Sequence, residues 1–369
     1  MIKLIMSQCN YNINVLMHWS ITKPMVTQPD SQFPHHFRHF FTFSLRIIGS
    51  SFVIKIMSSE KSRAATTWAD WVLNSGWRAI ANQFDETVDW YTVSNESKAF
   101  DDNQDKCRYY NVGCFDWNRI VLKNGSPHND FYHANSVYLK GDDQFHVIAA
   151  QGPLYNTTDE FWELIYQEKV STIVQLCNFT EGPERIRCSE YWPKKNKRTF
   201  GDYTVSLEME DLIDENVPDV QLRTFTVRKE GESESHMVNH IFYKKWPDYS
   251  VPQTVTPLIT IVRWLEENGG MRKESPILVH CLAGIGRTGT LIVTLMGLRS
   301  IRTTNQLEEP SNFLMELAKE LRRHRDGSIQ TSQQYIYAHS ALLKLLAIEG
   351  LIEDDDRVKN FRYVNAPVF

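Results

Sequence analysis

The chain has 369 residues, a formal net charge of −5, 42% hydrophobic and 12% aromatic residues. This apolar content suffices for a sizeable core and excludes wholesale disorder. The mildly acidic balance lacks the basic stripe of nucleic-acid-binding proteins. Six irregularly spaced cysteines without a CxxC pair predict neither a zinc site nor a disulfide framework, and they favour free thiols in a reducing, cytoplasmic compartment.

Residues 1–60 differ in composition from the rest of the chain. We therefore predict a poorly patterned N-terminal extension over 1–60, one folded domain over 61–350 and a C-terminal tail over 351–369. The most apolar stretch, residues 40–54, contains Arg46 and is shorter than the roughly 20 apolar residues of a membrane-spanning helix. We expect a loosely attached or disordered segment there, with membrane association as the alternative. No pattern indicates an oligomeric state.

Within the folded domain, apolar residues from Trp68 to Ser75 recur at helical spacing and predict an amphipathic helix at its start. Strands and helices then interleave without a strict βαβ period. This arrangement predicts an α/β fold of the α+β type, a single domain with a central twisted mixed sheet flanked by helices. The expected strands are 120–122, 136–139, 172–176, 203–207, 220–229, 238–243 and 276–280; the expected helices are 159–168, 257–267 capped by Thr256, 288–301, one around 313–321, and 334–348.

The most informative stretch is Val279–Thr290, VHCLAGIGRTGT, where a strand leads through a glycine-rich loop into a helix. Glycines permit a tight backbone path in which successive N–H groups turn inward and bind a tetrahedral oxyanion. The helix beginning near Thr288 adds its positive end. Arg287 supplies a planar fork for phosphate oxygens. The pattern therefore predicts a phosphate-binding loop around Cys281.

The same features favour the thiolate of Cys281, which would be nucleophilic at neutral pH. We expect His280 to order the loop rather than to act as a base, and the Thr288 hydroxyl to stabilise the sulfur when it leaves. A buried, inert cysteine is the alternative for an isolated Cys. It is disfavoured here because Arg287 follows at a fixed spacing with three glycines between Cys281 and Thr290.

The stretch HCLAGIGRTG resembles the HCxxGxGRTG signature of cysteine-dependent protein phosphatases. The resemblance implies that the loop binds phosphate through the backbone N–H groups of Leu282, Ala283, Gly284, Ile285 and Gly286. Leu282 stands where that family usually carries a small or polar residue. Because this position contributes its backbone, we expect activity to survive the difference.

A phosphate ester also needs an acid that protonates the leaving oxygen. Trp246-Pro247-Asp248 lies 33 residues (281 − 248) before the cysteine and resembles the mobile acid loop of tyrosine phosphatases. The resemblance implies that Asp248 is the general acid and later the base for water. Tyr249 would cap the pocket.

Further stretches resemble the tyrosine-specific branch. In KCRYYNVGCFDWNRIVL, Lys106–Leu122, Tyr109 would stack on the substrate ring and Asn111 would hold the substrate backbone. In IQTSQQY, Ile329–Tyr335, Gln330 and Gln334 would orient the hydrolytic water. The stretches Tyr132–Asn135 and Gln151–Trp162 look like framework.

Together these motifs predict a protein tyrosine phosphatase that acts on phosphotyrosine-containing proteins through a cysteinyl-phosphate, with no metal and no cofactor. Two alternatives stay open. A dual-specificity or lipid phosphatase would share the cysteine loop, and an inactive phosphotyrosine-binding module would share the fold.

Overall fold

The computed structural model describes residues 41–47, 50–56, 62–88, 95–123, 130–180, 188–268, 271–361 and 363, with the backbone alone for 41–56. The chain divides into two compact units, Met1–Glu60 and Lys61–Phe369. In the first unit, β1 (Phe41–Ile47) and β2 (Ser50–Ile56) pair as an antiparallel hairpin. The stretch considered as a possible membrane segment is thus largely β-strand. No helix in the described ranges is long and apolar enough to cross a membrane.

The second unit is built on a nine-stranded mixed sheet with the order β3-β4-β5-β11-β6-β10-β9-β8-β7, so the predicted fold class is confirmed. The strands are β3 (Arg119–Val121), β4 (Phe131–Leu139), β5 (Asp142–Ala150), β6 (Thr172–Gln175), β7 (Lys197–Phe200), β8 (Tyr203–Leu212), β9 (Val220–Lys229), β10 (Ser235–Tyr243) and β11 (Ile277–His280).

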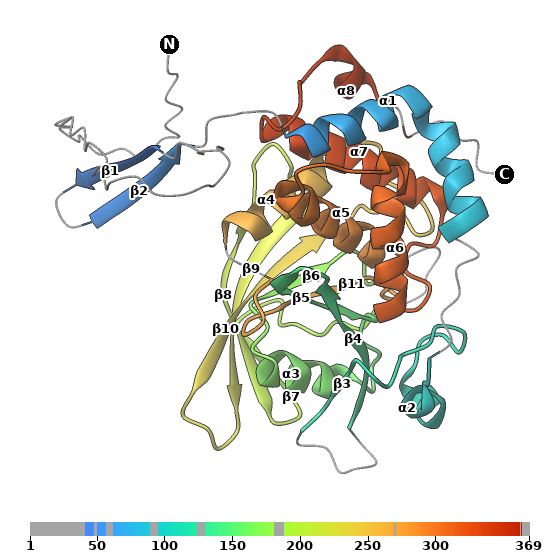
Figure 1. Ribbon diagram of the computed structural model, residues 1–369. Coiled ribbons are helices and arrows are strands. Elements are labelled where there is room, and N and C mark those ends of the chain that lie inside the picture. Colours follow the sequence, from blue (N-terminus) through green and yellow to red (C-terminus); the bar gives the residue numbers. More distant parts are fainter. Residues whose placement is uncertain are drawn as a thin grey trace, which may run out of the picture. The chain divides into compact units, whose positions relative to one another are not determined.

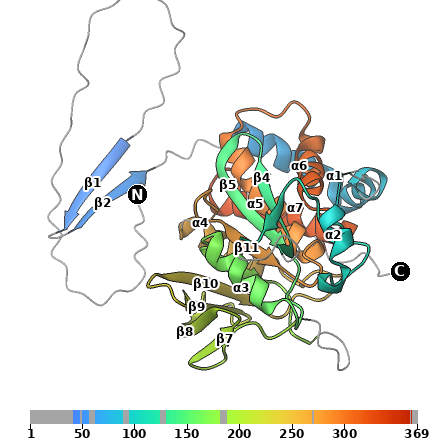
Figure 2. The ribbon, with the colours of Figure 1, turned by 90° about the horizontal axis from the view of Figure 1, so that it is seen from below.

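Helices cover both faces of this sheet (Figures 1 and 2). The helices α1, α4, α5, α6 and α7 pack together on one side, whereas α3 lies against the other. The helical elements are α1 (Arg63–Gln83), η1 (Phe84–Val88), α2 (Lys98–Asp102), η2 (Gln104–Lys106), α3 (Thr158–Gln167), α4 (Thr256–Glu267), α5 (Gly286–Thr303), η3 (Pro310–Asn312), α6 (Phe313–His324), α7 (Ser332–Ile348) and α8 (Asp356–Asn360).

Strand β11 fixes the position of the site. It pairs in parallel with β5 on one side and β6 on the other, and all four of its residues are buried. A strand buried on both faces is expected to be a short apolar run, as ILVH is. Its carboxyl end delivers Cys281, and α5 begins five residues later.

Most predicted elements are present, and β9 has the predicted bounds. The predictions missed β5 and β7. Helix α5 begins at Gly286, two residues before the predicted start, so Arg287 lies inside its first turn. Helix α4 contains Thr256, and Val255 occupies its N-cap position without a side-chain cap. The residues assigned to a C-terminal tail include α8, and three of them, Ile352, Val358 and Tyr363, lie in the core of the second unit.

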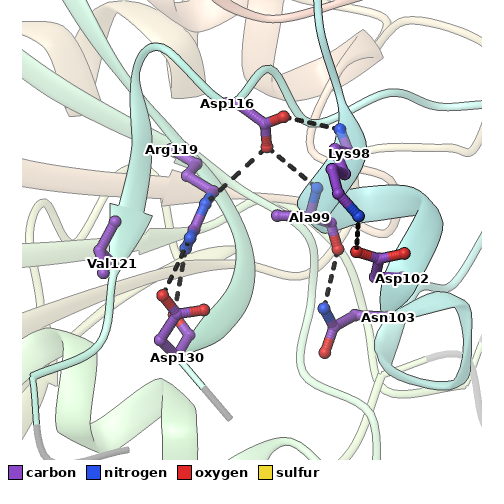
Figure 3. Close-up of a pocket in the computed structure, with 8 residues that line it drawn as sticks. All are labelled: Lys98, Ala99, Asp102, Asn103, Asp116, Arg119, Val121 and Asp130. Atoms are coloured by element: carbon purple, nitrogen blue, oxygen red, sulfur yellow. Dashed lines mark hydrogen bonds and ion pairs between the residues drawn. The ribbon is translucent and has the colours of Figure 1, made fainter. Parts of the chain in front are cut away.

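The short helix α2 is held by a carboxylate distant in sequence. Ser97 precedes α2 but gives no side-chain cap. Instead, Asp116 accepts hydrogen bonds from Lys98 N at 2.6 Å and Ala99 N at 3.1 Å. Both sides of this contact line a pocket of about 560 Å³, shown in Figure 3. The ionic groups lining it pair with one another: Lys98 with Asp102, and Arg119 with Asp116 and Asp130.

We predict that Asp116→Ala lowers the free energy of unfolding by about 1–2 kcal/mol, because the α2 N-terminus loses its carboxylate cap. Urea denaturation measures the change. Asp102→Ala is the matched control, because it removes an acid from the same pocket. Asp102 pairs with Lys98, and the side chains are 60% and 80% exposed. Exposed ion pairs of this kind contribute little to stability. Equal losses in both variants would contradict the capping role.

Candidate active site

The carbonyl groups of the loop between β11 and α5 are hydrogen-bonded to residues outside that loop. All five carbonyls from Cys281 to Ile285 accept hydrogen bonds. The donors are His280 Nδ1 to Cys281 (3.1 Å), Gly152 N to Leu282 (2.9 Å), Arg325 Nη2 to Ala283 (2.9 Å), Arg325 Nε to Gly284 (3.2 Å), and Gly289 N (2.8 Å) and Ile329 N (3.0 Å) to Ile285.

These hydrogen bonds fix the orientation of the peptide groups, and with it the direction of the loop N–H groups. In a trans peptide the C=O of one residue and the N–H of the next point in opposite directions. Carbonyls that bond outward therefore leave the N–H groups of residues 282–286 facing the concave side. Successive inward N–H groups form an anion-binding nest. The bonded carbonyls support the predicted role of the Leu282–Gly286 N–H groups, which stays a prediction.

Two glycines of the loop meet different constraints. Gly284 has φ of +73°, and a Cβ there would lie 2.1 Å from Ala150 O. Gly286 instead allows close approach, because a Cβ there would lie 2.3 Å from Gln330 Oε1 and 3.0 Å from Gln334 Nε2. The loop therefore packs directly against the two glutamines.

Arg325 is a loop support that sequence reasoning missed. Its side chain is fully buried and holds two consecutive carbonyls of the loop. Its remaining nitrogen, Nη1, donates to Asn135 Oδ1 at 2.7 Å. Burial lowers the pKa of Arg325, with nearby cysteine and aspartate side chains opposing that shift. The only signal in the sequence is a basic stretch, RRHR, at the end of a predicted helix, which is ordinarily a solvated face.

Arg287 and Asp248 are brought together. Arg287 Nη2 lies 2.8 Å from Asp248 Oδ1, and Nη1 donates to the backbone oxygens of Trp246 (3.1 Å) and Leu176 (3.3 Å). Arg287 is 2% exposed, whereas Asp248 is partly exposed. Trp246 is buried, and its Nε1 donates to Ser250 O at 3.1 Å. The WPD segment is thus docked on the arginine of the cysteine loop.

Tyr109 lies beside the cysteine loop. Its half-buried side chain packs with Val112, Ala283 and Ile285 in one apolar cluster. The side-chain amide of Gln151 holds the backbone just before Tyr109 through two hydrogen bonds. Gln151 Oε1 accepts from Arg108 N at 3.0 Å, and Gln151 Nε2 donates to Lys106 O at 2.7 Å. Gly152 bonds the cysteine loop itself, so one segment ties both parts of the site together.

Gln330 lies just before α7 and Gln334 lies in its first turn, and both side chains pack against Gly286. Gln334 Oε1 accepts from Gln330 N at 2.8 Å. Gln334 Nε2 and Thr288 Oγ1 are buried polar atoms without a hydrogen-bond partner in the described part of the chain, so each can bond to a water or a ligand. Ile329 precedes them with φ of 64°, a conformation that a β-branched residue rarely adopts.

His280 orders the loop, as the sequence predicted. Its Nδ1 faces the Cys281 carbonyl, which can only accept, so Nδ1 carries the proton. Its Nε2 then accepts from Tyr191 Oη at 2.7 Å. Tyr191 is fully buried and reaches Gln175 Oε1 at 3.0 Å and His240 Nε2 at 2.9 Å. Sequence reasoning gave Tyr191 no role.

The structure therefore brings most predicted site residues to one place, the carboxyl end of β11. These are Cys281, Leu282, Ala283, Gly284, Ile285, Gly286, Arg287, Thr288, Asp248, Tyr109, Gln330 and Gln334. Asn111 and Tyr249 are exposed, and no recorded hydrogen bond joins their side chains to the loop in the described ranges. Tyr249 has φ of 51° and donates its N–H to Asp248 Oδ1 at 3.2 Å.

Comparison with known proteins agrees with this geometry. A family model described as protein-tyrosine phosphatase matches residues 103–344. Similar proteins include the Tyrosine-protein phosphatase Lar-like of Caenorhabditis elegans, 36% identical over 254 residues (67% of this chain, 11% of that protein). Others are the receptor-type tyrosine-protein phosphatase eta of Gallus gallus, 34% identical (66% of this chain, 17% of that protein), and the human tyrosine-protein phosphatase non-receptor type 7, 33% identical (68% of this chain, 66% of that protein).

The chain thus spans 11% and 17% of the length of these two larger relatives. The matched residues nevertheless include the cysteine loop, the WPD segment, Tyr109 and both glutamines. From the sequence motifs, the geometry of the site and the matched family model, the chain belongs to the protein-tyrosine phosphatase family.

Proposed function

We propose that this chain hydrolyses phosphotyrosine on proteins through a cysteinyl-phosphate intermediate. The observation that carries the proposal is the cysteine loop, whose five carbonyls bond outward while its N–H groups face the concave side. This backbone would bind three phosphate oxygens without a metal. The Arg287 fork would supply the matching positive charge.

In the first step, the Cys281 thiolate attacks phosphorus and the bond to the tyrosine oxygen breaks. Asp248 gives its proton to that oxygen, so tyrosine leaves neutral. The ion pair of Asp248 with Arg287 supports this role, because it brings the carboxyl group to the residue that would hold the phosphate. Phosphate would compete with Asp248 for the guanidinium and so redirect the carboxyl toward the leaving oxygen.

In the second step, water attacks the phosphocysteine and the thiolate leaves. Asp248, now a carboxylate, takes the proton of that water. Gln330 and Gln334 would orient the water, which their position against Gly286 supports. The unpartnered Thr288 hydroxyl would donate a hydrogen bond to the departing sulfur. The two steps together regenerate the enzyme.

Selectivity for phosphotyrosine would come from the depth of the substrate pocket. Tyr109 packs against Ala283 and Ile285, so its ring stands as a wall over the loop. A phenyl phosphate would stack on that wall, whereas phosphoserine would be too short to reach the sulfur. Asn111 would hold the substrate backbone, and Tyr249 would cover the pocket once the WPD segment has closed on substrate.

Two alternatives make different predictions. A dual-specificity or lipid phosphatase would turn over phosphothreonine or phosphoinositide at rates comparable with phosphotyrosine. An inactive phosphotyrosine-binding module would bind phosphotyrosine and leave aryl phosphates intact. The presence of Tyr109, Asp248, Gln330 and Gln334 around one loop favours the active tyrosine enzyme over both. The five cysteines in the described ranges are free thiols, which supports our proposal of a cytoplasmic, signalling role.

The first prediction from the proposed function concerns the nucleophile and the acid. Cys281→Ser is expected to abolish turnover of a phosphotyrosine peptide and to keep binding. Asp248→Ala is expected to lower kcat by about 10²–10⁴-fold and to remove the alkaline limb of the kcat–pH profile, because that limb reports the acid. Glu267→Ala, on the exposed end of α4, is the control. Full activity in either site variant would defeat the mechanism.

The second prediction concerns Arg325, a positioning residue. Arg325→Lys keeps the charge but cannot make three directed hydrogen bonds at once, so the loop carbonyls would lose their outward anchor. We expect weaker inhibition by vanadate together with lower kcat, by roughly tenfold or more each. Arg323→Lys, at an exposed position of α6 two residues before Arg325, should change neither. A purely structural role would lower the melting temperature and leave vanadate binding per folded molecule intact.

The third prediction concerns selectivity. Tyr109→Ala is expected to raise KM for an aryl phosphate several-fold, because the ring contact contributes about 1 kcal/mol. Tyr110→Ala provides a matched control, since Tyr110 is 86% exposed. Similar KM values for both variants would exclude Tyr109 as the wall of the pocket.

A further inference from the structure

Two thiols and an imidazole converge behind the cysteine loop. Cys177, Cys188 and His280 are each fully buried. One ligand atom from each, the two Sγ atoms and a ring nitrogen, all lie within 4.8 Å of one another. They come from three separate segments: the turn after β6, the residue before Ser189, and the last position of β11. Spacing along the sequence cannot reveal such a cluster, which the fold alone assembles.

Gly152 locates the cluster relative to the nucleophile. A Cβ built on Gly152 would lie 3.1 Å from Cys188 Sγ, 3.5 Å from His280 Nδ1 and 2.5 Å from Cys281 O. Cys188 Sγ and His280 Nδ1 therefore both border Gly152. The same nitrogen donates to Cys281 O, one of the five outward contacts of the loop.

We propose that Cys177, Cys188 and His280 bind a thiophilic divalent cation, Zn²⁺, and that its binding inhibits the enzyme. The binding step is independent of the phosphatase activity, and only the inhibition rests on the proposed function. The site lies beside the catalytic loop and contains neither Cys281 nor Asp248.

The geometry suits zinc. Zinc takes Cys sulfur at about 2.3 Å and His nitrogen at about 2.0 Å in tetrahedral arrangement, so its ligand atoms stand roughly 3.4–3.8 Å apart. Three atoms already within 4.8 Å reach that spacing by small side-chain rotations. Three protein ligands rather than four predict a weaker, reversible site.

The charge balance suits zinc as well. The reaction takes two thiols and Zn²⁺ to a neutral dithiolate complex and releases two protons. A neutral complex carries little desolvation cost in a fully buried site.

Inhibition follows from the nitrogen that the metal would use. Zinc at Nδ1 requires the imidazole proton to move to Nε2, which would then donate to Tyr191 Oη. Tyr191 can in turn donate to Gln175 Oε1, 3.0 Å away. The hydrogen bond to Cys281 O is lost in this tautomer. The loop thereby loses one hydrogen bond next to the nucleophile. Nε2 of His280 keeps Tyr191 as its hydrogen-bond partner.

The binding test uses the 369-residue chain carrying Cys281→Ser, so that the nucleophile cannot be the ligand. CoCl₂ is titrated in and the sulfur-to-cobalt charge-transfer band is recorded, followed by displacement with ZnCl₂. We expect one ion per chain, and loss of the band when Cys177→Ala or Cys188→Ala is added. Cys114→Ala, a buried cysteine packed with Phe100 and Phe131, is the matched control and should keep it.

The inhibition test uses chains that retain Cys281, each compared with its own metal-free rate on an aryl phosphate. We expect ZnCl₂ to inhibit the unmodified chain and Cys114→Ala alike, with the inhibitory concentration raised more than about tenfold in Cys177→Ala. The proposal is overturned by absence of the band in Cys281→Ser, by unchanged inhibition in Cys177→Ala, or by a chain lighter by two hydrogens and free of metal, which would reveal a disulfide. A chain that binds cobalt without any phosphatase activity would defeat the proposed function alone.

Discussion

The outward hydrogen bonding of five consecutive carbonyls is the constraint on which the site depends. Each carbonyl from Cys281 to Ile285 is held by a different neighbouring segment or by the deeply buried Arg325. The loop makes few hydrogen bonds with itself, so the anion-binding face is imposed by the surrounding fold. Strand β11, clamped in parallel between β5 and β6, fixes where that loop begins.

Arg287 connects this frame to Asp248, the proposed general acid. One guanidinium contacts the carboxylate of Asp248 and the backbone of Trp246 and Leu176. The same side chain would meet the phosphate. In the proposed mechanism, substrate binding and the placement of Asp248 are therefore alternative uses of one set of donors, which links the two events. An acid loop anchored by an unrelated residue would not be sensitive to substrate in this way.

Much of this site could be predicted from local sequence. The strand before Cys281, the glycines after it, and Arg287 lie within a few residues of one another, where backbone geometry and helix chemistry act directly. The WPD and QTSQQ stretches were found through resemblance. By contrast, Arg325, Gln151 and Tyr191 act across long sequence separations. A buried arginine in the stretch RRHR carries no local mark that separates it from its exposed neighbour Arg323, because only tertiary packing distinguishes them.

The sequence predicted the fold to a similar extent. Apolar periodicity found β6, β9, β11 and the long helices, but it missed the central strand β5. Strand β7, with three exposed residues, offers no apolar pattern. The segment after residue 350 has charged residues near its beginning, and this pattern predicts a tail. The aromatic ring of Tyr363 nevertheless packs on that of Tyr337, with ring centroids 5.1 Å apart, and brings the end of the described chain into the core.

Ile329 shows how the fold maintains the glutamine pair. A β-branched residue with positive φ carries a conformational penalty of about 1–3 kcal/mol. Its N–H donates to Ile285 O, and its carbonyl accepts from the buried Arg322 at 2.8 Å. These bonds hold the backbone in a shape that the free peptide would avoid. The backbone before α7 is thus held from two sides, by Ile285 and by Arg322. The orientation of Gln330 depends on α6, which carries Arg322, as much as on α7.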